Sequence, residues 1–148
     1  MYRLFLLALP LLALGCRGPA IPEELPVTLL AQGQQSQQTE QRFEWITRPA
    51  EFTALWQELL SGDPPAVDFE RDGVIAVFMG ERPTGGHAIR VERVARGADG
   101  LLVEVVLQTP SPECMTTQAV TRPYQTVLVP HTAPRATFTT HTVVIPCR

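Results

Sequence analysis

A short apolar run near the middle of the chain most constrains the fold. Residues 74–79 read VIAVFM and contain no polar side chain. An uninterrupted apolar run of this length, bounded by turn-forming residues, is typical of a strand that is buried on both faces. The run therefore predicts a central strand in a sheet that is covered on both sides.

One segment, residues 49–60, has the apolar spacing of an amphipathic helix. Its apolar residues recur at positions i, i+3, i+4, i+7 and i+8 and form one stripe: Phe52, Leu55, Trp56, Leu59 and Leu60. Pro49 suits the first helical turn, and Gly62 suits the end of a helix. We expect this helix to pack on the sheet through the stripe, with Trp56 in the core.

The remainder of the chain after residue 26 is typical of strands joined by tight turns. The 14 Pro and 10 Gly of the whole chain favour many short elements. Strands are expected at residues 27–31, 43–47, 74–79, 87–95, 101–107, 124–129 and 136–145. The Gln-rich residues 32–41 are interpreted as a hairpin connection. The predicted fold is mainly β (α+β), a small antiparallel β sandwich or curled sheet of about seven strands with one packed amphipathic helix.

The first 15 residues are typical of a secretory signal peptide. Arg3 precedes an apolar run over residues 4–14, which is too short to cross roughly 30 Å of hydrocarbon. The segment ends in ALGC and resembles a bacterial lipobox, which makes Cys16 the expected lipidation site. An ordinary cleaved signal peptide with an incidental cysteine is the alternative.

These observations divide the chain into three parts. Residues 1–15 are the expected lipoprotein signal peptide, residues 16–26 the lipidated cysteine and a Pro-rich tether, and residues 27–148 the β-rich domain. Two or more acyl chains anchor a protein stably to a membrane. We therefore expect an exported lipoprotein that is anchored to a membrane of the bacterial cell envelope.

Export also bears on the two other cysteines, Cys114 and Cys147. Disulfides persist outside the cytosol, and a bridge between these residues would pin the C-terminus to the loop at residues 111–117. We expect this bridge, with two free buried thiols as the alternative. No CxxC or HxxxH spacing occurs, so no metal site is expected.

Composition argues against several classes of function. The formal net charge of −3 gives no electrostatic reason to expect binding of nucleic acid, which selects a basic face. All 12 cationic side chains are Arg, which excludes a catalytic or Schiff-base lysine. No serine lies in a GxSxG motif, and the three histidines are far apart in sequence. We expect no catalytic residue and no cofactor, although an active site assembled from distant positions is left open.

Two loops contain the candidate binding residues. The first, residues 80–87, follows the most buried strand and contains three Gly and one Pro, which favour a tight backbone with little side-chain cover. The second, residues 109–124, is long for a compact domain. Met115 and Tyr124 are expected in the core, with exposed anchors as the alternative. Each loop is either a stiff connection or a rigid surface for a partner.

The sequences around these loops resemble the PrcB family of protease complex subunits. The resemblance covers roughly residues 27–130 and is carried by EFTALWQEL, VDFERDG, VIAVFMGERPTGGHAIRVERV and PECMTTQAVTRPYQTVLVP. Its most specific motif is RPTGG at residues 82–86, which the family usually follows with an aromatic residue and this chain follows with His87. A second motif is TRPY at residues 121–124.

The resemblance implies a non-catalytic binding module. The family's named member is a small lipoprotein that accompanies a surface protease and helps it to mature or remain stable. The implied partner is therefore another protein, a secreted protease, in addition to the membrane that holds the lipid. The implied partner-binding residues are Arg82, Pro83, Thr84, Gly85, Gly86, His87, Arg122, Pro123 and Tyr124.

The same loops are also similar to those of chagasin-type cysteine-peptidase inhibitors. These inhibitors present a Pro-Thr-Thr-Gly-aromatic loop and an Arg-Pro-aromatic loop from an immunoglobulin-like sandwich. PTGGH at residues 83–87 and RPY at residues 122–124 occur in that order, but with shorter spacing and without the Gly-rich middle loop. A peptidase inhibitor is therefore one alternative function, and an envelope scaffold lipoprotein is another.

Overall fold

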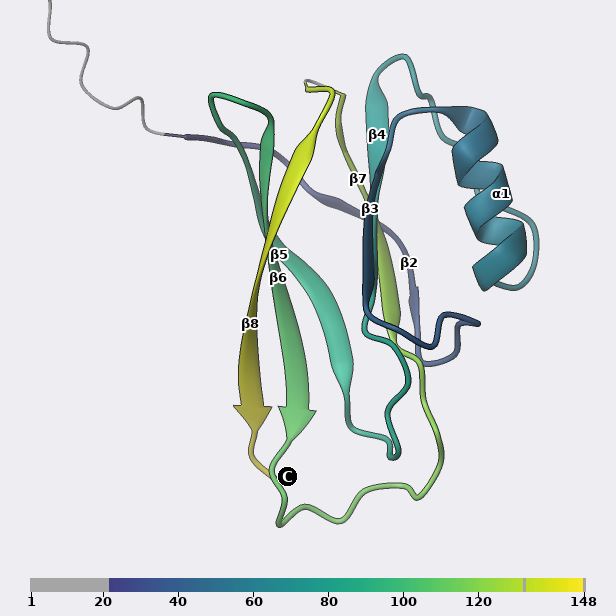
Figure 1. Cartoon of the computed structure of the whole chain (residues 1–148), viewed down its shortest axis with the longest axis vertical. Helices are drawn as coiled ribbons and strands as arrows, with labels where there is room; N and C mark the ends of the chain where they lie inside the picture. Colours follow the sequence, from purple (N-terminus) through teal and green to yellow (C-terminus); the bar gives the residue numbers. More distant parts are fainter. Residues whose placement is uncertain (1–21, 132, 148) are drawn as a thin grey trace, which may run out of the picture.

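The computed structural model describes residues 22–131 and 133–147, and its architecture is a small β sandwich with one helix (Figure 1). The described residues form β1 (Glu23–Glu24), β2 (Thr28–Gly33), β3 (Arg42–Ile46), α1 (Pro49–Leu59), β4 (Asp72–Phe78), β5 (Ala88–Arg96), β6 (Leu101–Pro110), β7 (Tyr124–Pro130) and β8 (Ala136–Ile145). The predicted fold class is confirmed. The expected signal peptide and Cys16 lie outside the described residues, among which no helix is long and apolar enough to cross a membrane.

The strands form two four-stranded sheets that differ in how they are covered. One has the order β2-β7-β4-β3 and carries α1 on its outer face (Figure 1); we call it the helix-covered sheet. The other has the order β1-β5-β6-β8, and we call it the bare sheet because no helix of residues 22–131 and 133–147 lies on its outer face (Figure 1). The main core lies between the two sheets.

Strand β4 is buried on both faces, as its apolar sequence predicts. Alternate residues point to opposite sides of a strand, so Val74, Ala76 and Phe78 pack with the helix, whereas Ile75 and Val77 pack in the core between the sheets. All five side chains are inaccessible to solvent. The strand also pairs with a neighbour on each edge, β3 and β7.

The helix also forms where its apolar stripe predicts. Pro49 occupies the first turn, and the chain leaves the helix through Leu60 and then Gly62, whose φ is +85°. Trp56 is buried, with its ring 5.5 Å from that of Phe52 in an edge-on arrangement. The stripe therefore closes the outer face of the helix-covered sheet.

The Gln-rich segment is not a hairpin, and that prediction was wrong. Strands β2 and β3 lie at opposite edges of the helix-covered sheet, because the more apolar β7 and β4 occupy its centre. The connection therefore crosses the end of the sheet. Ser36 is buried there, and its backbone N–H donates to the carbonyl of Arg122 at 3.1 Å.

The bare sheet departs from a purely antiparallel arrangement. Strand β8 runs parallel to β6, in register from Leu101 opposite Ala136 to Pro110 opposite Ile145. A parallel pair needs a crossover connection, and β7 of the opposite sheet supplies it. Strand β8 therefore becomes an edge strand of the bare sheet.

Residues 23–25, at the end of the expected tether, pack with the folded domain. Glu23 and Glu24 pair with β5, and the backbone N–H of Leu25 donates to the carbonyl of Val94 at 2.8 Å. The Leu25 side chain is buried in the main core. Residues 23–25, which were expected in the tether over residues 16–26, are therefore part of the folded domain.

Candidate functional site

The two motif loops lie side by side at one end of the sandwich, the lower end in Figure 1. We call residues 80–87 the glycine loop and residues 111–123 the disulfide loop. Arg82 and Thr121 form a two-way backbone bridge with N···O distances of 2.8 and 2.9 Å. The N–H of Gly85 donates to the carbonyl of Thr117 at 2.9 Å. The fold thus joins two motifs that are about forty residues apart into one surface.

Side chains strengthen this pairing. The hydroxyl of Thr121 donates to the carbonyl of Thr84 at 3.0 Å. The guanidinium of Arg122 donates twice to Oε2 of Glu81, at 2.6 and 3.0 Å. Arg82 donates from Nη2 to the carbonyl of Met79 at 3.0 Å. These polar groups are occupied within the protein, so they hold the loops in place.

Two glycines fix the backbone of the glycine loop. Gly80 has a φ of +80°, and a Cβ at this position would lie 2.8 Å from the backbone of Glu40. Gly86 has a φ of +85°. Side chains rarely adopt this region of φ, so both positions need glycine for the shape of the loop. Gly85 has no such φ, and a Cβ there would meet Thr117 at an ordinary 3.4 Å.

The predicted partner-binding residues divide into exposed and internal positions. Pro83 and Gly86 are exposed, and Arg82, Thr84, Gly85, His87, Arg122 and Tyr124 are half-buried. Pro123 is buried, and Tyr124 stacks on Phe78 with ring centroids 6.2 Å apart. The TRPY motif therefore contributes mainly to packing, and the glycine loop provides more of the accessible surface.

His87 lies in an unfavourable environment for its charged form. Burial, followed by the positive charge of Arg82, lowers the pKa of His87 below its ordinary value. Nδ1 of His87 and Nε of Arg82 are buried without a hydrogen-bond partner among the described residues. These surroundings therefore favour the uncharged form of the imidazole.

The predicted disulfide between Cys114 and Cys147 is confirmed. The two Cα atoms are 5.2 Å apart, and the residues are separated by 33 positions in sequence. Beside the bridge, the N–H of Ser111 donates to the carbonyl of Ile145 at 2.9 Å. The bridge thus attaches the disulfide loop to the end of β8.

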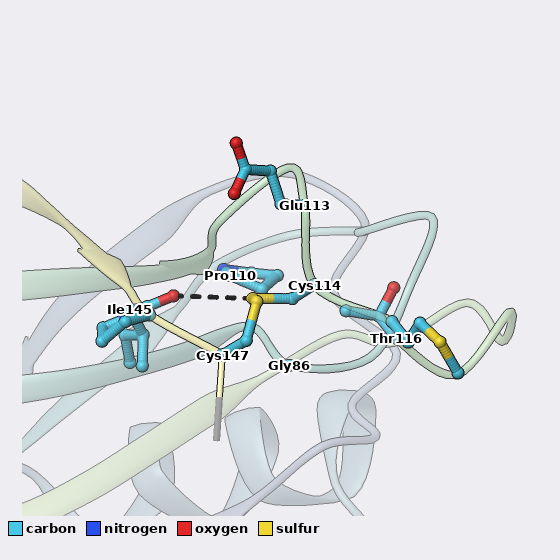
Figure 2. Close-up of a pocket in the computed structure, with 9 residues that line it drawn as sticks. Gly86, Pro110, Glu113, Cys114, Thr116, Ile145 and Cys147 are labelled. Atoms are coloured by element: carbon cyan, nitrogen blue, oxygen red, sulfur yellow. Dashed lines mark hydrogen bonds between the residues drawn. A yellow bond between two sulfur atoms is a disulfide. The ribbon is translucent and has the colours of Figure 1, made fainter.

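A pocket of about 610 Å³ opens beside this bridge; we call it the disulfide pocket. Figure 2 shows its wall, to which Gly86, Pro110 and Ile145 contribute together with the disulfide. Met115 and Pro146 add further apolar groups, and Glu113 and Thr116 are its polar side chains. The sequence did not predict the pocket, because its walls come from the glycine loop, β6, the disulfide loop and the C-terminal segment.

Met115 lies on the surface rather than in the core. Its side chain is fully exposed, as is about half of Val120 on the same loop. The expectation of a core position was wrong for Met115, because the disulfide loop leaves the sandwich instead of folding back over it. Tyr124 follows the expectation more closely, since it packs on Phe78. The loop therefore presents apolar groups next to the pocket.

The three histidines lie in separate places. His87 is in the glycine loop, Nδ1 of His131 lies 3.3 Å from the carbonyl of Phe69, and Nε2 of His141 lies 3.2 Å from a carboxylate oxygen of Glu92. Within residues 22–131 and 133–147, no group of three or more His, Cys, Asp or Glu residues is placed to hold a metal ion. The described site is therefore a surface of packed loops and an apolar pocket.

A family model described as PrcB C-terminal matches residues 74–130. The match confirms the predicted PrcB resemblance. The matched segment runs from β4 to β7 and includes both motif loops, but it is shorter than the span over which the resemblance was expected. No curated protein and no solved structure matches the chain.

Proposed function

We propose that this chain is an exported, lipid-anchored and non-catalytic module that binds another protein. Its partner is a secreted protease, for which it acts as an accessory or stabilising subunit. The observation that carries this proposal is the hydrogen-bonded pairing of the glycine loop with the disulfide loop. The paired loops present exposed apolar side chains and the disulfide pocket on one surface.

The stiffness of this end supports a binding role. The two loops are held by backbone hydrogen bonds to each other and by the Cys114–Cys147 disulfide. Both constraints reduce the conformational entropy that the loops would lose on association. Met115 and Val120 provide apolar contacts at its surface, and the flexible methionine side chain adapts to a partner. A fixed frame with apolar anchors is typical of protein-binding sites.

The proposed location rests on two features. The disulfide fits an oxidising compartment outside the cytosol, and the N-terminal sequence resembles a lipoprotein signal with Cys16 as the acylated residue. Mass spectrometry of the mature protein tests the anchor. An acylated Cys16 is the expected result, and an unmodified N-terminus would remove the anchor from the proposal.

We propose a protease as the partner because of the PrcB family description. Recovery of that protease by two variants with altered surface residues tests the role of the loops.

The two variants are Val120→Glu and Leu102→Glu. The two original side chains are similarly exposed, at 48% and 42%, but they lie at opposite ends of the sandwich. The protein would be crosslinked in its own membranes and recovered. We expect Val120→Glu to lower recovery of a protease at least tenfold and Leu102→Glu to leave it unchanged. Equal recovery from both variants would contradict a binding role for the loops.

A peptidase inhibitor has less support from the geometry. An inhibitory wedge would need the RPY segment on the surface, whereas Pro123 is buried and Tyr124 packs on Phe78. The purified domain is therefore expected to leave papain-like peptidases active at micromolar concentration. Inhibition at lower concentration would favour the inhibitor over the accessory subunit.

A further inference from the structure

Strand β8 has an unpaired edge. Among the described residues, β8 pairs with β6 alone and ends the order of the bare sheet. The carbonyls of Arg135 and Ile145 accept bonds from the N–H groups of Leu101 and Ser111. Because the backbone groups of a strand alternate between its two edges, the odd-numbered residues face β6. The N–H and C=O groups of the even-numbered residues from Ala136 to Val144 therefore point to the open edge.

This edge lacks the features that protect the other sheet edges. Strand β1 has only two residues, β2 contains a register shift between Leu29 and Ala31, and β3 carries the charged residues Arg42 and Glu44. Short length, bulges and charges are the usual means of preventing another chain from pairing. Strand β8 has ten residues, with no Pro and no Asp, Glu, Lys or Arg, in uninterrupted register with β6.

The open edge leads to the disulfide pocket. Residues 139–144 of β8 are exposed, and the next three residues, Ile145, Pro146 and Cys147, form part of the pocket wall. Ile145 and Cys147 are labelled in Figure 2. The pocket thus adjoins the end of the strand whose edge is open. Binding by strand addition uses the same combination, in which main-chain bonds supply affinity and a pocket supplies specificity.

We propose that β8 binds an extended, uncharged segment of the partner protein as a further strand of the bare sheet. An apolar side chain of that segment occupies the disulfide pocket. The inference rests on the proposed function, since it describes how the same partner is held. We expect an uncharged segment because β8 has no Asp, Glu, Lys or Arg side chain with which a charged neighbour could pair.

A second copy of this chain fits the site poorly. Symmetric antiparallel pairing of two β8 strands would bring the second copy's Ala136 end to Ile145, and one methyl group cannot fill a pocket of about 610 Å³. A partner segment with a larger apolar residue satisfies both the edge and the pocket.

The test uses a display library of random ten-residue peptides, selected on the full chain in detergent. The blocking variant is Thr140→Pro with Thr142→Pro, because proline removes N–H groups at an edge without breaking the ladder to β6. The matched control is Thr140→Val with Thr142→Val, which keeps both N–H groups. We expect the selection to enrich uncharged peptides rich in β-branched residues. Their affinity should be at least tenfold lower for the proline variant than for the original protein. Their affinity for the valine variant should lie within twofold of that for the original protein.

A second measurement does not depend on how the proline variant folds. A selected peptide is expected to slow hydrogen exchange of the unaltered chain at the N–H groups of Phe138, Thr140 and Thr142. The inference is overturned if no peptide is enriched, if exchange at these positions is unchanged, or if peptides bind the proline variant equally well. It is also overturned if sedimentation shows a dimer that the proline substitutions dissociate, because β8 would then bind a second copy.

The two proposals fail separately. If the folded proline variant still recovers the protease from membranes while peptide binding is absent, strand addition is wrong and the accessory function stands. If peptides bind β8 but Val120→Glu leaves protease recovery unchanged, the edge accepts a strand and the proposed role of the loops is wrong.

Discussion

The two sheets of the sandwich have similar numbers of strands but contrasting surroundings. In the helix-covered sheet, Val74 to Phe78 are inaccessible to solvent on both faces. On the bare sheet, the outer face carries partly exposed ion pairs such as Arg93 with Glu104, at 3.2 Å, and Arg90 with Glu92, at 2.9 Å. Exposed pairs of this kind add little stability. The comparison indicates that both faces of the covered sheet stabilise the fold, whereas the bare sheet does so through its inner face alone. The outer face, loops and edge of the bare sheet are available for binding.

The largest expected effect contrasts two phenylalanines, one in each sheet. Phe78 in β4 is fully buried, whereas Phe138 in β8 is half-buried against Phe43. Phe78→Ala should reduce the free energy of unfolding by about 3–5 kcal/mol, and Phe138→Ala by about half as much, because less area is buried. Urea unfolding of both variants measures the difference. Equal losses would contradict the assignment of stability to the covered sheet.

Removal of the disulfide should have the next largest effect. In the chain-entropy model, a bridge that closes a loop of 33 residues contributes about 3–4 kcal/mol. Replacing Cys114 and Cys147 with Ser should lower the free energy of unfolding by this amount and also weaken peptide binding at β8. Urea unfolding with and without reductant checks the first effect. If the serine variant is as stable as the original protein, the bridge does not stabilise the binding end.

Alanine substitutions at two glycines test which positions fix the backbone of the glycine loop. Gly80→Ala places a Cβ at a positive φ and 2.8 Å from backbone, so it should cost about 1–3 kcal/mol. Gly85→Ala meets only an ordinary contact with Thr117 and should change stability by less than about 0.5 kcal/mol. Thermal unfolding of both variants provides the comparison. A large loss in Gly85→Ala would mean that this position shapes the loop rather than its surface.

The smallest expected effect is a pH dependence at His87. Its folded pKa lies below the ordinary value of 6.5 because of burial and Arg82. As the pH falls below about 6.5, the unfolded chain binds a proton that the folded chain does not, so stability present at neutral pH is lost. His87→Phe should reduce this loss. Urea midpoints between pH 7.5 and about 5 measure it, and identical profiles would show that His87 does not contribute.

Local patterns predicted the elements whose formation depends on nearby residues. The apolar stripe predicted α1, and the VIAVFM run predicted β4, because both signals lie within one segment. Pairing between strands is a long-range property, so the Gln-rich connection was misread as a hairpin and the parallel β6–β8 pair was not foreseen.

The candidate site was predictable only in part, for the same reason. The RPTGG and TRPY motifs were found in the sequence, and their contact follows from the bridge between Arg82 and Thr121. The disulfide pocket combines Gly86, Pro110 and Ile145 from separate segments, and no local pattern links them. Lipidation of Cys16 stays a prediction from the signal sequence.

The most direct test of the account is site-specific photocrosslinking in native membranes. A photoreactive residue would replace either Met115, which is fully exposed at the loop end, or Leu102, which is exposed at the opposite end of the sandwich. The account predicts that irradiation joins the Met115 variant to a secreted protease and leaves the Leu102 variant unjoined. A protease adduct from Leu102 alone, or no adduct from Met115, would contradict a partner-binding surface formed by the paired loops.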